Sequence, residues 1–372
     1  MKIPAGSRFF IILTISRSHL KTILYVIDSL SVGGAERLLV ETINNLPEFR
    51  IVVVTLYPGD DLLPELNCHS VHCLDFKGKL TIPTTVLKLR KLITSYCPDI
   101  VHAHLLWSTF IARLATPKSI PFYFSVHSTL SKDAFGKNKL SLFLEKVTYK
   151  PWHTAIFVSE YVKSDYDQSV GLRGPAHVLY NFIPDQFFQN FRLKPDNKLE
   201  KFVAVGNLKE AKNYQYLIEA FKILKEKGVS ATLDIYGQGY LQKTLQQEID
   251  KYQLPIKLKG TAKNIHTILP QYDAYVLCSM HEGFGLAPVE AMAVGLPVFL
   301  SDIPIMHEVS GGHAVFFNPQ RPEDFAGKVQ EAMGQADKLK LHAEQAHAFA
   351  LKLASHKSYL KGLYQIYGNS LK

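Results

Sequence analysis

The chain has 372 residues, of which 47% are hydrophobic and 20% charged, a composition typical of soluble globular proteins with sizeable cores. Its net charge is +9, and the two halves contribute similarly, with 20 basic and 15 acidic residues in 1–185 and 22 and 18 in the rest. The excess of positive charge is therefore spread over both halves of the chain, which argues against a dedicated nucleic-acid-binding face. It remains compatible with anionic ligands and with an anionic membrane surface.

The four cysteines form no CxxC pair, which indicates a reducing compartment. Two Cys and two His fall within the six residues from Cys68 to Cys73 and raise the question of zinc. These side chains are too close in sequence to surround a tetrahedral ion without a second ligand pair. The alternation around His72 instead predicts a short strand.

The segment before residue 20 contains the apolar run Phe9–Ile15. This run is far shorter than the ~20 residues that span a bilayer, and no convincing cleavage site follows it. We favour an extension ahead of the first strand over a signal-like or membrane-touching element. No other segment is long and apolar enough to span.

Short apolar runs alternate with helical stretches in the first half of the chain. The pattern predicts strands at 22–27, 51–56, 100–103 and 122–126, and helices at 35–43, 81–95 and 108–115. Strand–helix alternation of this kind predicts βαβ units and a parallel sheet.

The pattern breaks at the polar stretch 192–201 and then starts again. We expect strands at 202–205, 231–236, 256–258, 274–277 and 297–300, and a helix at 214–227. Two successive units predict an α/β fold of two facing Rossmann-like domains, with the ligand site in the interdomain cleft at the carboxyl ends of the strands. The expected domains are 1–188 and 189–352, and a helix within 353–372 is expected to pack back on the first.

A glycine-containing loop with two glutamates follows the strand at 274–277. Gly283 and Gly285 allow the backbone to approach a ligand closely, and a helix over 288–294 would offer free N–H groups to a diphosphate. Glu282 falls in the loop and Glu290 in the first helical turn, where carboxylates can accept sugar or ribose hydroxyls. Favourable interaction with the helix dipole is an alternative role for Glu290.

A second polar loop follows the strand at 202–205 and carries Lys209 and Lys212 into the next helix. A lysine at this place can neutralise a departing diphosphate. A solvated loop lysine is the alternative.

Residues 202–310 resemble the nucleotide-sugar-binding domain of the GT-B glycosyltransferases, specifically the retaining family called glycosyltransferase family 4. The E-x7-E motif of that family is met by Glu282 and Glu290, and its G-R-L-x-x-x-K segment by Gly206-Asn207-Leu208 and Lys212. Asn207 stands where many members have Arg, so the resemblance implies a diphosphate site with one positive charge fewer.

The first half matches the same family less strictly, and the resemblance covers about residues 22–370. The sequence from Gly33-Gly34 to Glu36 resembles the Gly-rich loop that faces the donor phosphates. The segments 99–104 and 125–127 resemble strand ends on the acceptor side, and His127 matches a position beside the donor sugar. For His102 we favour a packed strand residue.

The resemblance implies a bacterial retaining glycosyltransferase that moves a sugar from a nucleoside diphosphate sugar, such as a UDP-sugar, to a glycan or lipid-linked acceptor. Synthesis of lipopolysaccharide, capsule or exopolysaccharide is the expected setting. Lys212 would stabilise the phosphates, Glu282 would hold donor-sugar hydroxyls, Glu290 the ribose, and His127 would act near the reacting carbon. The expected catalytic residues are His127, Glu282 and Lys212, and the expected donor-binding residues are Gly33, Gly34, Gly206, Asn207, Lys212, Gly237, Asn264, Ile265, Glu282, Gly283, Phe284, Gly285, Leu286 and Glu290.

No cofactor and no obligatory metal are expected. The Asp165-Tyr166-Asp167 sequence resembles a metal-binding motif of other transferases, but it falls in a helical pattern and is interpreted as a solvated face. A nicotinamide-binding Rossmann protein is disfavoured because Gly33-Gly34 is no G-x-G-x-x-G loop. A non-enzymatic nucleotide-sugar-binding module is disfavoured because Glu282, Glu290 and Lys212 are all present.

The expected partners are the donor and the acceptor, with no nucleic acid. We expect a cytoplasmic location and leave open a peripheral contact at the inner face of the plasma membrane. The Lys-rich stretch 137–150 would suit a lipid-linked or surface-polysaccharide acceptor, and a solvated helix explains it equally well.

Overall fold

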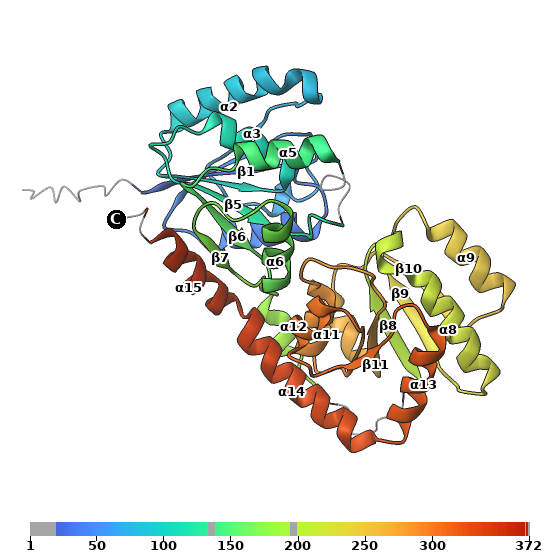
Figure 1. Ribbon diagram of the computed structural model, residues 1–372. Helices are drawn as coiled ribbons and strands as arrows, with labels where there is room; N and C mark the ends of the chain where they lie inside the picture. Colours follow the sequence, from blue (N-terminus) through green and yellow to red (C-terminus); the bar gives the residue numbers. More distant parts are fainter. Residues whose placement is uncertain (1–19, 133–137, 194–198, 369, 371–372) are drawn as a thin grey trace, which may run out of the picture.

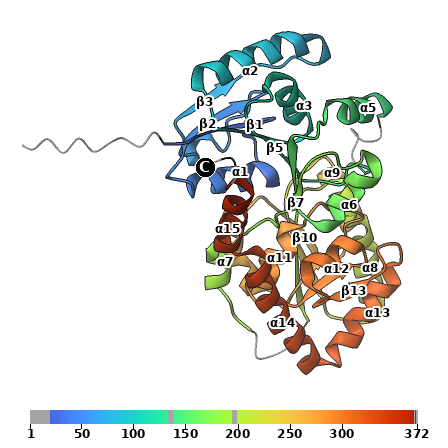
Figure 2. The same ribbon diagram turned by 60° about the vertical axis from the view of Figure 1, so that its left-hand side comes forward.

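A computed structural model describes residues 20–132, 138–193, 199–368 and 370. The apolar run at 9–15 lies outside the described residues. Two parallel sheets of seven and six strands, each covered by helices, make up the fold (Figures 1 and 2). The predicted α/β fold with two facing Rossmann-like units is confirmed.

The first sheet has the order β3-β2-β1-β4-β5-β6-β7, and all its neighbouring strands are parallel. Its strands are β1 (Thr22–Ile27), β2 (Arg50–Thr55), β3 (Ser70–Cys73), β4 (Ile100–His104), β5 (Phe122–Val126), β6 (His153–Phe157) and β7 (Ala176–Val178). The helices of this half are α1 (Gly34–Asn44), α2 (Ile82–Tyr96), α3 (Leu106–Ala115), α5 (Lys139–Thr148), α6 (Glu160–Ser169) and α7 (Asp185–Gln189).

Both faces of this sheet are buried, because successive strand residues point to opposite faces. Leu24 and Val26 of β1 belong to a core shared with α2 and α3. The intervening Ile23 and Tyr25 belong to a second core, shared with α1. The near-continuous apolar runs in the sequence are therefore what a doubly covered parallel sheet requires.

The second sheet has the order β10-β9-β8-β11-β12-β13, which repeats the order of the first six strands of the first sheet. Its strands are β8 (Lys201–Val205), β9 (Thr232–Tyr236), β10 (Ile256–Gly260), β11 (Ala274–Leu277), β12 (Val298–Ser301) and β13 (Val315–Phe317). Its helices are α8 (Tyr214–Glu226), α9 (Gln242–Lys251), α10 (Ile265–Ile268), α11 (Leu286–Ala293), α12 (Pro304–Ser310), α13 (Pro322–Met333) and α14 (Ala336–Ala354).

The last helix, α15 (His356–Tyr367), returns to the first sheet (Figure 2). Tyr359, Leu363 and Tyr367 are buried in the core that contains Ile23 and Tyr25. The hydroxyl of Tyr367 lies 2.5 Å from Nδ1 of His102. The domain limits at residues 188 and 352 stay predictions. Within the described ranges, no helix has the length and apolar character needed to cross a membrane.

The predicted start of the helix over 288–294 is wrong. Helix α11 begins at Leu286, so Pro288 is its third residue and Glu290 lies in its second turn. Gly285 adopts a positive φ of 83° and turns the chain into the helix two residues early. Proline is tolerated at its position because the first N–H groups of a helix have no intrahelical partner. Glu290 therefore does not lie in the first turn, where a carboxylate would interact with the helix dipole.

Candidate functional site

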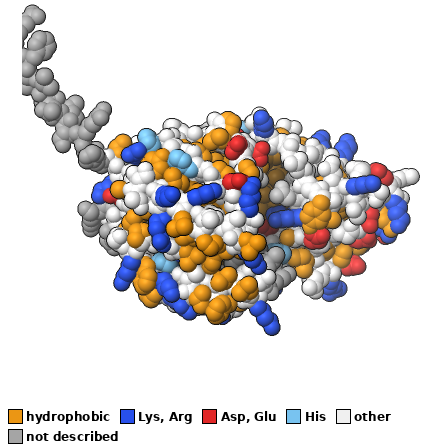
Figure 3. All heavy atoms as spheres, turned by 90° about the horizontal axis from the view of Figure 1, so that it is seen from above, with side chains coloured by type: hydrophobic (Ala, Val, Ile, Leu, Met, Phe, Trp, Pro, Cys, Tyr) orange, Lys and Arg blue, Asp and Glu red, His pale blue; other side chains and the backbone are white. Residues whose placement is uncertain are grey.

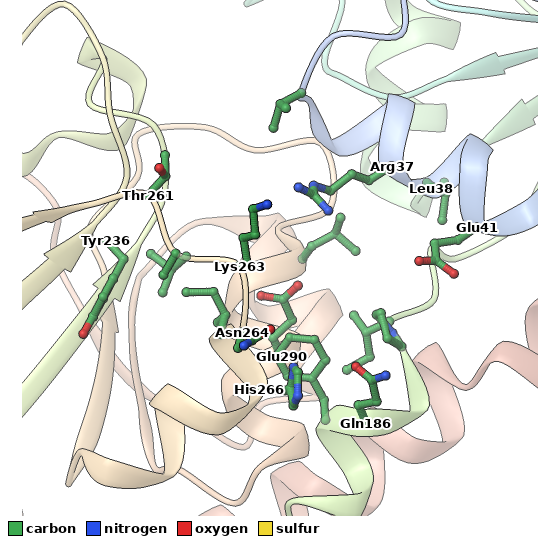
Figure 4. Close-up of a pocket in the computed structure, with 18 of the residues that line it drawn as sticks. Arg37, Leu38, Glu41, Gln186, Tyr236, Thr261, Lys263, Asn264, His266 and Glu290 are labelled. Atoms are coloured by element: carbon green, nitrogen blue, oxygen red, sulfur yellow. The ribbon is translucent and has the colours of Figure 1, made fainter. Parts of the chain in front are cut away.

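A cleft of about 430 Å³ lies between the two sheets, near the carboxyl ends of their strands (Figure 4). Helix α1, the segment 182–187, the loops after β8, β9 and β10, and helix α11 all line it. Seven of the predicted donor-binding residues are brought together here: Gly206, Asn207, Gly237, Asn264, Ile265, Leu286 and Glu290. The remaining predicted residues do not line this cleft.

Lys212 and Glu282 contact each other directly. The Nζ atom of Lys212 lies 2.5 Å from Oε1 of Glu282, and the hydroxyl of Ser279 donates to the same oxygen at 2.6 Å. Burial alone would raise the pKa of Glu282, but the charge and hydrogen bond of Lys212, with help from Ser279 and Lys209, lower it. Glu282 is therefore an ionised carboxylate held beside the lysine.

Glu290 titrates differently from Glu282. Burial raises its pKa to about 7, and the charge of Arg37 opposes this shift only in part. Figure 4 shows Arg37 of α1 and Lys263 of the loop after β10 reaching into the same pocket as Glu290. The sequence reasoning missed Arg37 and Lys263, although Arg37 follows the predicted Gly33-Gly34 loop by one helical turn.

The N-termini of α1 and α11 approach each other across the two halves of the fold. A Cβ atom added at Gly34 would lie 3.8 Å from Cδ1 of Leu286, the first residue of α11. Neither helix has a side-chain cap hydrogen bond at its start. Glu36 folds back on Gly33, where an added Cβ would lie within 2.1 Å of its carboxylate. The first turns of α1 and α11 therefore lie close together, with the Glu36 carboxylate folded over the start of α1. N–H groups at a helix start suit an anion.

The loop containing Gly283 touches the first half of the fold. A Cβ atom at Gly283 would lie 2.0 Å from the carbonyl oxygen of His127. The hydroxyl of Ser159 donates to the carbonyl of Gly283 at 2.9 Å. The predicted residues Gly283 and His127, 156 positions apart in the chain, are therefore in contact.

His127 is half-buried and lies beside the buried His104, at the ends of β5 and β4. Its Nε2 lies 3.0 Å from Nδ1 of His104, and its Nδ1 is buried with no hydrogen-bond partner in the described part of the chain. Burial lowers the pKa of His127 to about 4 and that of His104 well below its usual value. Both rings are therefore neutral near pH 7.

His102 is a packed strand residue, as expected. Its ring is buried, with Nδ1 against Tyr367 and Nε2 2.9 Å from the hydroxyl of Ser125. Burial, and to a smaller extent His127, lowers its pKa to about 3.

A second pocket of about 220 Å³ adjoins His127 on the first half of the fold. Asp28, Leu106, Trp107, Leu130 and Glu145 are among the residues that line it. Its lining is largely apolar, and it reaches from the strand ends to the inner side of α5.

The Cys68–Cys73 segment contains the predicted short strand, β3. His69 lies 2.8 Å from the guanidinium of Arg50, and His72 lies 2.7 Å from the hydroxyl of Tyr96. Over the described ranges, no three His, Cys, Asp or Glu side chains are grouped as a metal site would need.

The Asp-Tyr-Asp sequence lies in the helix α6, as predicted. Asp167 is exposed and Asp165 is partly exposed, which fits the predicted solvated face, and both carboxylates also accept a backbone hydrogen bond. Asp165 accepts a hydrogen bond from the Ser131 N–H at 3.0 Å, and Asp167 from the Leu172 N–H at 3.0 Å.

Comparison with known proteins adds independent findings. The family described as Glycosyltransferase Family 4 matches residues 32–187, and the family described as Glycosyl transferases group 1 matches residues 185–348. EpsF of Bacillus subtilis, assigned as a glycosyltransferase, is 26% identical over 321 residues, which cover 79% of this chain and 82% of that protein. The O-antigen chain mannosyltransferase RfbU of Salmonella typhimurium is 26% identical over 215 residues, 56% of this chain and 57% of that protein.

Among solved structures, HepE of Anabaena, in complex with UDP and glucose, superposes with a TM-score of 0.79 at 19% sequence identity. The match covers 94% of this chain and all of that chain, which shows a shared GT-B fold. The nicotinamide-binding and non-enzymatic alternatives are set aside by these matches. The two family matches are consecutive, they span both sheets, and the chain belongs to the retaining, group 1 glycosyltransferases of family 4.

Proposed function

We propose that this glycosyltransferase uses a UDP-sugar or a related nucleoside diphosphate sugar and delivers the sugar to a glycan or lipid-linked acceptor in cell-surface polysaccharide synthesis. HepE was solved with UDP and glucose, and RfbU is named an O-antigen chain mannosyltransferase. The observation that carries the donor assignment is the close approach of the α1 and α11 N-termini. The Lys212–Glu282 ion pair supports it, because Glu282 lies in the loop that leads into α11.

In the proposed complex the diphosphate lies between these two helix starts, where free N–H groups favour negative charge. It competes with Glu282 for Lys212, because one ammonium cannot fully neutralise both. Lys212 then stabilises the departing diphosphate, and Glu282, still held by Ser279, accepts hydroxyls of the donor sugar. Glu290 accepts the ribose hydroxyls.

Asn207 leaves the phosphate site with one cation fewer than the common pattern of the family. Arg37 and Lys263 line the same cleft from opposite halves of the fold. We propose that these two side chains supply the missing positive charge. An arginine donates in a planar fork that suits phosphate oxygens, so Arg37 is the stronger candidate of the two.

Retention at the anomeric carbon is assigned to attack from the same face as the departing diphosphate, whose oxygen takes the acceptor proton. The transition state carries positive charge on the sugar and negative charge on the phosphates, so stabilisation is mainly electrostatic. The neutral ring of His127 hydrogen-bonds groups near the reacting carbon. The proposal requires neither a covalent nucleophile nor a metal ion.

A thermal-shift screen with UDP, GDP and their sugars tests the donor site. A donor present at 100 times its Kd should stabilise the protein by about 2.7 kcal/mol. Lys212→Ala and Glu282→Ala should fold but lose transfer activity, and chelators should leave the wild-type rate unchanged. A screen without any stabilising nucleotide, or full activity in either variant, would refute the assigned site.

A further inference from the structure

The first turn of α6 is capped from both halves of the fold. Its N-cap residue, Ser159, accepts a hydrogen bond from the Val162 N–H at 3.1 Å. The N–H groups of Glu160 and Tyr161 donate instead to the two carboxylate oxygens of Glu308, at 2.6 and 3.0 Å. Glu308 belongs to α12 of the second half, 148 positions after Glu160. A carboxylate of one half therefore neutralises the partial positive charge at a helix start of the other half.

The same helix start holds the loop that carries Glu282. The buried hydroxyl of Ser159 donates to the carbonyl of Gly283 at 2.9 Å while its oxygen caps α6. Gly283 in turn lies against the carbonyl of His127. One helical turn of the first half is thus bound to two elements of the second half, which are α12 and the loop that contacts His127.

Tyr180, which follows β7, completes this junction. Burial raises the pKa of its hydroxyl, and the charge and hydrogen bond of Glu308 raise it further. The ring of Tyr180 lies 6.2 Å, centre to centre, from that of Phe284 in the loop after Glu282. Glu308 therefore accepts hydrogen bonds from two backbone N–H groups and from a neutral phenol. We call this set the α6 junction; it comprises Ser159, Glu160, Tyr161, Tyr180, Gly283, Phe284 and Glu308.

Glu308 lies at a place from which it can act only indirectly on a molecule bound in the cleft. It is half-buried and does not line the cleft of about 430 Å³. Seen from above, the molecular surface is hollowed where the two halves meet (Figure 3). A contact that crosses between the halves therefore influences how far apart they stand. Hydrogen bonds to a charged acceptor are about twice as strong as neutral ones, so the Glu308 cap is a strong contact of this kind.

We propose that Glu308 is a positioning residue for sugar transfer. Its cap on α6 holds His127, in the first half, at a fixed distance from the second-half residues Lys212 and Glu290. Loss of the carboxylate leaves two N–H groups of α6 without their acceptor and lets the halves shift relative to each other. His127 then moves away from the reacting carbon, whereas the diphosphate site around Lys212 is preserved. The effect on transfer rests on the proposed function, but the effect on the distance between the halves does not.

The distance between the halves tests the cap without any substrate. Spin labels are attached to the exposed Cys97 of the first half and to Gln247→Cys on α9, with Cys68 and Cys73 replaced by Ser. Pulsed electron resonance should give a broader or shifted distance distribution for Glu308→Ala than for the same labelled protein with Glu308 in place.

A second variant removes the same contact from the other side. Glu160→Pro deletes the N–H that Glu308 accepts, and the proline ring displaces the carboxylate from that place. Proline is favoured at the first position of a helix, and the extended backbone of Ser159 suits a residue before proline, so α6 should still form. The distance distribution should match that of Glu308→Ala, and the double variant should add no further change. The matched control is Glu160→Ala, which removes only an exposed side chain paired with Lys163 and should behave like wild type.

Calorimetry with UDP and the rate of UDP release from UDP-glucose test the role in transfer. For Glu308→Ala and Glu160→Pro we expect kcat to fall about 10-fold, a loss of ~1.4 kcal/mol that lies within the range known for charges at partly buried helix ends. The Kd for UDP should change by less than about twofold, because the cap acts on the placement of His127 and not on the phosphate-binding groups of the second half.

Unchanged distance distributions in both junction variants would overturn the proposal. A changed distribution with kcat within about twofold of wild type, or with equal losses in kcat and UDP affinity, would also overturn the positioning role. If wild type binds no UDP, the proposed donor site itself is wrong, and the distance measurement still decides whether Glu308 spaces the two halves.

Discussion

Replacement of Gly283 by alanine is the sharpest test of how the two halves of the fold meet. The new Cβ would lie 2.0 Å from the carbonyl oxygen of His127, 2.9 Å from its carbonyl carbon and 3.0 Å from Cα of Ser128. All three atoms belong to backbone, so no side-chain rotation can relieve the contact. Since C···O contacts in proteins are about 3.3 Å or longer, the loop must move by roughly 1 Å.

A displacement of about 1 Å at a reacting centre can reduce the rate about 100-fold. We therefore expect Gly283→Ala to lower kcat by about that factor while the protein still folds. The control is Gly327→Ala in the helix α13, where an added Cβ meets no atom within 4 Å. Alanine there should keep full activity and stabilise the helix by up to ~1 kcal/mol. Transfer kinetics and thermal melts of both variants test this prediction. A Gly283→Ala enzyme with kcat within twofold of wild type would refute the contact between Gly283 and His127.

Three further predictions concern titratable groups. Because Glu290 has a pKa of about 7 and its carboxylate is proposed to bind ribose, donor affinity should fall up to about 10-fold per pH unit below 7, and Glu290→Gln should flatten this profile in calorimetric titrations. The pKa of His127 is depressed to about 4 in the folded protein, so the neutral ring's contribution to the free energy of unfolding is complete above about pH 6.5 and is lost as pH falls towards 4. In urea unfolding between pH 4 and about pH 6.5, the stability of His127→Asn should therefore depend less on pH than that of wild type. Glu145→Ala leaves the buried Arg113 without its carboxylate and should cost about 3–5 kcal/mol in urea unfolding, whereas the exposed Glu323→Ala should change little.

The central strands could be predicted well from the sequence because buried strands appear there as continuous runs of apolar residues. The strands β1, β2, β4 and β5 all lie within one residue of their predicted bounds. The strand β6 was missed, although it has five residues and lies between β5 and β7. The strands β7 and β13 were missed because each has three residues and pairs with a single neighbour at the sheet edge. Such short edge strands bury little and leave no alternating pattern to read.

The residues of the candidate site also differ in how far they could be predicted from the sequence. Glu282, Glu290 and Lys212 could be predicted as site residues from the sequence because they lie in one motif-bearing half of the chain, and their roles stay predictions. Arg37 and Lys263 line the same cleft only because the two halves of the fold face each other. No spacing of residues in the sequence predicts that arrangement. The His104–His127 contact also arises from the fold, since it joins the ends of adjacent strands.

At least three separate contacts among the described residues hold the two halves together, which decides what Gly283→Ala should do. Besides the Gly283–His127 contact, Glu308 of α12 accepts hydrogen bonds from the first backbone N–H groups of α6, at 2.6 and 3.0 Å. The returning α15 buries Tyr359 and Tyr367 in the first half. With the second and third contacts intact, an alanine at 283 tilts the halves apart instead of separating them.

Such a tilt leaves most of the proposed donor site in place, because Lys212, Glu290 and the loops after β8 and β10 all belong to the second half. It moves His127 away from the proposed position of the donor sugar. We therefore expect the Kd for the donor to change several-fold less than kcat in Gly283→Ala. Equal losses in affinity and kcat would instead mean that the first half contributes mainly to donor binding, through Gly33, Gly34 and Arg37.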